Sequence, residues 1–120
     1  SGRMAYNDQT SYAMAFANDL IPDDYKEKTK QYFKQSIIDQ QHRLGTGFHG
    51  TANLLKGLRC ADLEEMIEQL LLQENLPGWM YQIKHGATSI WERWNAIGED
   101  GSIYDPEMNS FNHYAFGSVC

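Results

Sequence analysis

The chain has 120 residues, of which 42% are hydrophobic and 22% charged, which suits one small domain with its own core and not a disordered acidic tail. The formal net charge is −6 and the pI about 5.0, and no Lys- or Arg-rich run is present. This composition argues against nucleic acid or an anionic membrane as the partner. No apolar run approaches the ~20 residues that a membrane-spanning helix needs.

The two ends and the two cysteines leave the cellular compartment open. The start lacks the apolar region of a signal peptide, which slightly favours the cytoplasm. Residues 1–4, Ser-Gly-Arg-Met, are a candidate cloning remnant, and the natural chain is expected to continue beyond Cys120. Cys60 and Cys120 form no CxxC motif, and two free thiols are favoured over a bridge.

Helical periodicity dominates the first forty residues. Tyr12, Ala13, Phe16 and Leu20 share one face of a helix predicted over about residues 8–20, which Pro22 ends. A second helix is predicted to run from there to about residue 41. Its expected buried side consists of Tyr25, Tyr32, Phe33, Ser36 and Ile37.

The middle of the chain combines a glycine-rich break with a strongly amphipathic helix. Three glycines within residues 45–50 predict an inter-helix turn, and Thr51 is the expected N-cap of a short helix to Leu58. Asp62 and Glu65 have the spacing of a capping box before the next helix. That helix has apolar residues at helical spacing, namely Leu63, Met66, Ile67, Leu70 and Leu71.

The last third begins after Pro77-Gly78 with an aromatic-rich stretch, residues 79–94. Residues 98–101, Gly-Glu-Asp-Gly, predict a turn. A last helix is expected from about Ser110, using Phe111, Tyr114 and Ala115. Because no convincing alternating strand pattern appears, the sequence predicts an all-α fold of helix pairs.

The aromatic-rich stretch contains all three tryptophans, Trp79, Trp91 and Trp94, with Glu92 between the last two. Aromatic rings can bury the apolar face of a sugar while a carboxylate binds its hydroxyls, so this pattern suits carbohydrate. Spacing alone favours a plainer interpretation, in which the tryptophans are core and Glu92 pairs with Arg93. His113, likewise, is more simply a helix histidine than a ligand contact.

The sequence does not suggest a metal or a cofactor. There is no HExxH motif and no cluster of paired carboxylates, and the four histidines lack metal-ligand spacing. The glycine-rich turn is not followed by Gly-Lys-Ser/Thr, which argues against a phosphate-binding loop.

Five strings, in matching order and spacing, resemble bacterial α-L-rhamnosidases of glycoside hydrolase family 78. They are DQTSYA (8–13), HRLGTGFHGT (42–51), LLLQ with PGWMY (70–73 and 77–81), GATSIWERW (86–94) and DPEMNSFNHYAFG (105–117). The resemblance covers nearly the whole chain and departs from the family at His49, where an apolar residue is common.

The resemblance implies part of an (α/α)6 barrel that hydrolyses terminal α-L-rhamnose with inversion at the anomeric carbon. It places the general base at Glu92 and a pocket-lining residue at His113. Weaker candidates for pocket walls, in the same motifs, are Trp79, Tyr81, Trp91 and Trp94. The family's general acid lies upstream of this stretch, so residues 1–120 are expected to be a fragment of one catalytic domain that is nearly inactive alone.

Three further expectations accompany this resemblance. The implied ligand is a rhamnose-containing glycoside or oligosaccharide. Helix faces that would meet absent neighbours are expected to drive self-association. Two other functions remain open: a non-catalytic helical carbohydrate-binding or interaction module, and another (α/α)6 sugar enzyme such as an unsaturated glucuronyl hydrolase.

Overall fold

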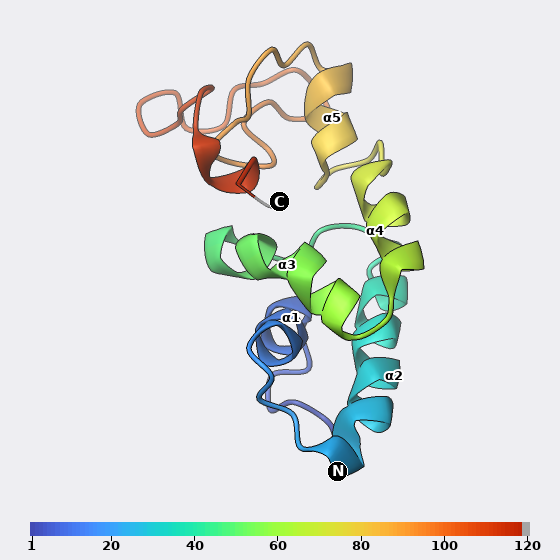
Figure 1. Ribbon diagram of the computed structural model, residues 1–120. Helices are drawn as coiled ribbons and strands as arrows, with labels where there is room; N and C mark the ends of the chain where they lie inside the picture. The colour runs from blue at the N-terminus through green and yellow to red at the C-terminus, as the bar shows by residue number, and fades with distance from the viewer. Residues whose placement is uncertain (119–120) are drawn as a thin grey trace.

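The computed structural model describes residues 1–118, and its regular structure there is helical (Figure 1). The elements are α1 (Gln9–Ala17), α2 (Asp23–Asp39), α3 (Phe48–Cys60), α4 (Glu64–Leu71), α5 (Trp79–Lys84) and a short 3-10 helix, η1 (Tyr114–Phe116). Within these residues the only β pairing is an isolated antiparallel bridge between Ile97 and Ile103. The prediction of an all-α fold is therefore confirmed. No helix in the described part of the chain is long and apolar enough to cross a bilayer.

The helices are arranged in an elongated body of 47 × 24 × 22 Å. Figure 1 shows α2 and α4 following one another along one side, with α1 and α3 packed together beside them. Helix α5 and the irregular segment that follows it form the opposite end from the N-terminus. Because η1 returns to contact α3, the irregular segment is brought against the glycine-rich turn.

The first helix begins at a side-chain cap and buries an aromatic face. Asp8 accepts a hydrogen bond from the Ser11 amide at 2.8 Å, which satisfies one of the free N–H groups at the helix start. Tyr12 and Phe16 are buried and stack on Phe33 of α2, with ring centroids 5.9 and 5.8 Å apart. Leu20 is 70% exposed, so its predicted burial is wrong, because the helix ends at Ala17.

The second helix agrees with its prediction except at its first turn. Pro22 is its N-cap, and Asp23 and Asp24 occupy the first turn, where negative charge is favourable. Phe33, Ser36 and Ile37 are buried and Tyr32 is partly buried. Tyr25 is 44% exposed, which contradicts its predicted burial.

The third helix begins four residues earlier than predicted. Its N-cap is Gly47 in an extended conformation, and Thr51 is buried inside the helix. Gly50, predicted to lie in the break, is helical and marks a close contact: a Cβ there would lie 2.5 Å from the Thr10 hydroxyl. Glycine at this position therefore permits helix packing.

The predicted capping box before α4 does not form. Asp62 has a φ of 51°, outside the extended conformation that an N-cap adopts, and the cap residue is Leu63 without a side-chain hydrogen bond. The predicted amphipathic face is confirmed, because Leu63, Met66 and Leu70 are buried and Ile67 packs against the same core.

The last predicted helix is also wrong, whereas the turn before it is confirmed. Gly101 donates to the Gly98 carbonyl at 2.9 Å, closing the turn. From Ser110 the backbone instead pairs with an earlier segment, leaving only the three residues of η1 in helical form. Cys60 is a free, exposed thiol, and Cys120 lies outside the described residues.

Candidate active site

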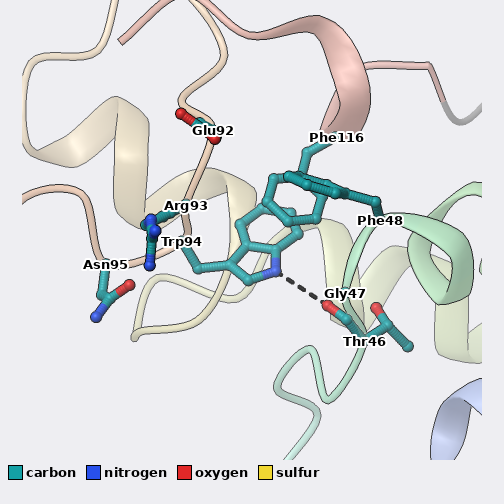
Figure 2. A pocket seen from close by; sticks show the side chains of 8 residues that line it. All are labelled: Thr46, Gly47, Phe48, Glu92, Arg93, Trp94, Asn95 and Phe116. Atoms are coloured by element: carbon teal, nitrogen blue, oxygen red, sulfur yellow. Dashed lines mark hydrogen bonds between the residues drawn. The ribbon is translucent and has the colours of Figure 1, made fainter. Parts of the chain in front are cut away.

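An open hollow of about 340 Å³ lies where the glycine-rich turn meets the aromatic-rich segment (Figure 2). Its lining comes from the turn and the start of α3, from the segment after Trp91, and from η1. The residues are Thr46, Gly47, Phe48, Glu92, Arg93, Trp94, Asn95 and Phe116. One side of the hollow is thus aromatic, and the other carries a carboxylate, a guanidinium and an amide.

Glu92 lies at this hollow and is partly buried. Its Oε2 atom accepts a hydrogen bond from the Ser110 amide at 2.9 Å, and its own amide donates to the Ser110 carbonyl at 2.8 Å. This double contact with one residue holds both the backbone and the carboxylate. Oε1 accepts no hydrogen bond from the residues that the structure describes, and Glu92 lines the hollow.

The predicted pairing of Glu92 with Arg93 is absent from the ion pairs within residues 1–118. The Arg93 guanidinium instead lies over the Tyr104 ring, 5.1 Å from its centroid. The Glu92 carboxylate therefore forms no ion pair within the described residues, although Arg93 lines the same hollow.

Trp94 connects the two sides of the hollow. Its ring stacks on Phe116 with centroids 3.9 Å apart, and its indole Nε1 donates to the Thr46 carbonyl at 3.2 Å (Figure 2). Trp79 meets Trp94 edge-on at 5.2 Å and donates from its own Nε1 to the Phe116 carbonyl at 2.8 Å. These contacts fix the aromatic wall from both the turn and η1.

His113 lies next to the hollow through Phe48. The two rings stack with centroids 5.4 Å apart and an interplanar angle of 13°. The His113 amide donates to the Ile90 carbonyl at 2.7 Å, and Nδ1 accepts from the Ala115 amide at 3.3 Å. Glu92 and His113 therefore lie on two paired backbone segments, 90–92 and 110–113, which sets their spacing.

The remaining candidates from the sequence are buried, and of these only Trp79 contacts the aromatic wall in the described structure. Trp91, Tyr81 and Trp79 are 3%, 2% and 9% exposed, and none lines the hollow. Trp91 and Tyr81 form a small core with Ala96, and the Tyr81 hydroxyl donates to the Ile97 carbonyl at 2.9 Å. Burial raises the pKa of Tyr81, and the nearby charges of Glu99 and Asp100 raise it further.

Sequence reasoning missed the residues that the glycine-rich turn contributes. Thr46, Gly47 and Phe48 lie more than forty residues before Glu92, and the turn was interpreted from composition as a plain connection. Phe48 is 43% exposed although it begins a helix, and it contacts both His113 and Phe116. A large aromatic residue directly after a glycine turn was the available signal. No group of three or more potential metal ligands occurs in the described part of the chain.

Aromatic side chains beside a carboxylate that forms no ion pair in the described residues suit the binding of carbohydrate. The comparisons with known proteins are specific. Residues 1–120 match the family model described as the bacterial alpha-L-rhamnosidase 6 hairpin glycosidase domain, and the chain belongs to this family. The five α-helices of the described residues accordingly form part of a six-hairpin (α/α)6 domain.

Relatives and solved structures agree over nearly the whole chain. The chain is 40% identical over 111 residues to an alpha-L-rhamnosidase of Formosa agariphila, covering 92% of this chain. The crystal structure of Streptomyces avermitilis alpha-L-rhamnosidase complexed with L-rhamnose matches 98% of it with a TM-score of 0.93 and 38% identity. That of native α-L-rhamnosidase from Aspergillus terreus matches 98% with a TM-score of 0.93 and 35% identity. The chain spans 12% of the first relative and 11% and 14% of the two solved chains.

Proposed function

We propose that this chain supplies the base side of the active site in an inverting α-L-rhamnosidase, as part of a longer parent enzyme. In this proposal Glu92 is the general base, and His113 and Trp94 contact the sugar. Phe48 and Phe116 complete an apolar wall beside them. Since Trp79, Trp91 and Tyr81 are buried, we assign them to the support of that wall.

One observation carries the proposal: Glu92 lines an aromatic-walled hollow, and the Ser110 amide anchors one of its carboxylate oxygens while the other accepts no hydrogen bond from the described residues. A base that activates water needs a fixed direction and an unoccupied lone pair. The hydrogen bond from the Ser110 amide fixes the direction of the carboxylate, and the absence of a cationic partner among the described residues supports an unoccupied lone pair. The solved relative from Streptomyces avermitilis, bound to L-rhamnose, supports rhamnose as the sugar.

The general acid is expected from another part of the parent enzyme. Inverting glycosidases separate their two carboxyl groups by roughly 6.5–9.5 Å, so that a water fits beside the base. Glu92 is the only carboxylate among the eight residues that line the hollow in the described structure. The same observation favours a second candidate, a non-catalytic carbohydrate-binding module, because aromatic walls with one carboxylate can bind sugar without cleaving it.

Glu92→Gln in the parent enzyme separates the two candidates. We expect hydrolysis of p-nitrophenyl α-L-rhamnoside to fall by about 10²–10⁴-fold, which is the usual contribution of a general base. Binding of L-rhamnose, measured by calorimetry, should persist because the amide keeps the size and one oxygen of the carboxylate. Glu107→Gln is the matched control, since Glu107 is exposed and outside the hollow.

Turnover by the Glu92→Gln enzyme equal to that of the control would exclude the role of base and leave the binding module. The 120-residue chain alone should be nearly inactive. A rate comparable to that of an intact rhamnosidase would overturn the assignment of the acid to another part of the enzyme.

A further inference from the structure

The turn between α2 and α3 is held almost entirely by distant partners. It has no regular secondary structure over residues 43–47, yet its backbone groups are hydrogen-bonded. Leu44 donates to the Pro77 carbonyl at 3.3 Å, and the Thr46 carbonyl accepts from Trp94. Because a loop without such bonds would be free to move, the position of this side of the hollow depends on these long-range contacts.

Gln9, the first residue of α1, makes two of those contacts. Its Oε1 atom accepts from the Gly45 amide at 2.8 Å, and its Nε2 atom donates to the Arg43 carbonyl at 2.8 Å. Nε2 also donates to Gln40 Oε1 at 3.1 Å. Both donor hydrogens and the acceptor of this side chain are thus in use, although Gln9 is 0% exposed. A fully buried amide is costly unless it is bonded in this way.

Gly45 shows how closely the turn is packed on the two glutamines. A Cβ at this position would collide with the side-chain amide of Gln40. The Gln40 side chain is exposed and can turn away from such a Cβ, so the fixed partner of the turn is the buried Gln9 amide.

We infer that Gln9 is a positioning residue for the sugar pocket, an inference that rests on the function proposed above. It touches no substrate. By binding both sides of the turn, it holds the Thr46 carbonyl where the Trp94 indole N–H meets it. Since Trp94 lies two residues after Glu92, this contact sets the separation between the turn wall and the wall that carries the base.

Gln9→Met in the parent enzyme removes the three hydrogen bonds while keeping most of the volume. We expect kcat/KM for p-nitrophenyl α-L-rhamnoside to fall about ten- to hundredfold, because a displacement of about 1 Å at a positioning group has this effect. The loss should appear mainly in KM, since Glu92 keeps its own anchor at Ser110. The matched control is Ser36→Ala, which removes one buried hydrogen bond in α2, to the Phe33 carbonyl, and should leave KM unchanged.

A double-mutant cycle with Trp94→Phe tests whether Gln9 acts through the contact between the Thr46 carbonyl and the Trp94 indole. Trp94→Phe removes the N–H that binds the turn, so its effect on L-rhamnose affinity should not add to that of Gln9→Met. The effects of Ser36→Ala and Trp94→Phe should add. If Gln9→Met does not fold, Gln9→Asn is measured in its place, because its side chain is one methylene shorter and cannot reach both sides of the turn, and KM should again rise.

Two results would overturn the inference. One is a KM within twofold of the Ser36→Ala control, for Gln9→Met or for Gln9→Asn where that replaces it. The other is additive effects of the Gln9 substitution and Trp94→Phe. A failure of the proposed function looks different, because the wild-type parent would then not hydrolyse the rhamnoside or would not respond to Glu92→Gln. If hydrolysis falls with Glu92→Gln but KM does not change with Gln9→Met, only this inference is refuted and the proposed function stands.

Discussion

The crossing of α1 and α3 offers a direct test of the packing that places the turn. A Cβ on Gly57 would lie 2.5 Å from the Ala13 carbonyl oxygen and 2.9 Å from its Cα. Both are backbone atoms, which cannot rotate away as a side chain can. Ordinary carbon contacts are about 3.5–4.0 Å, so Gly57→Ala must separate the two helices by about 1 Å.

The expected cost follows from what the crossing buries. Tyr12, Phe16, Leu54 and Leu58 are at most 7% exposed, and burial of such side chains contributes about 1.5–3 kcal/mol each. A gap of 0.5–1 Å forfeits about a quarter to a half of a contact's attraction. Alanine recovers about 1 kcal/mol through its higher helix propensity. We therefore expect a net loss of about 2 kcal/mol in the free energy of unfolding.

Urea unfolding of the 120-residue chain, followed by circular dichroism at 222 nm, measures this loss. Gly50→Ala is the matched comparison in the same helix, because its nearest neighbours are side-chain atoms, of Thr10 at 2.5 Å and of Thr46 at 2.9 Å, and not backbone atoms. It should cost less than Gly57→Ala. A Gly57→Ala chain as stable as wild type would refute the close backbone approach and, with it, the argument for the placement of α3.

Two other predictions concern the chain itself. Burial is the largest cause that raises the pKa of Tyr12 and of Tyr81 above 10.0. Because the unfolded state then loses these protons first, the free energy of unfolding should fall as pH rises above about 10. A titration at 295 nm in which all seven tyrosines ionise together would contradict this. Self-association is expected through exposed apolar residues such as Leu72 and Ile83, 58% and 60% exposed; sedimentation showing a compact monomer at high concentration would contradict it.

Helix positions were largely predictable from the order of residue types. The helical spacing of the apolar residues in Leu63–Leu71 predicted α4. Pro22, followed by two aspartates, predicted the start of α2. Failures occurred where tertiary contacts outweighed local preference. Gly50 is helical because it packs on Thr10, and residues 110–113 are extended because they pair with 90–92.

The candidate site followed a similar division. The family resemblance singled out Glu92, Trp94 and His113, whereas spacing alone favoured a structural role for the tryptophans and for Glu92. The sequence could not show that Glu92 avoids its neighbour Arg93, since adjacent residues of opposite charge suggest pairing. The sequence also could not show that Trp91 is buried in the core while Trp94 lines the hollow, because the two residues are of the same type and differ only in where their side chains point.

By itself, the sequence determined the helical class and the family motifs, because these depend on periodicity and local order, and the motifs in turn proposed Glu92 as the candidate base. Only the tertiary structure decided which face each tryptophan presents and which distant segment completes the hollow. Gln9, Thr46 and Phe48 belong to the site through contacts spanning tens of residues. Such contacts leave no periodic trace in the chain, since their partners are chosen by packing in three dimensions.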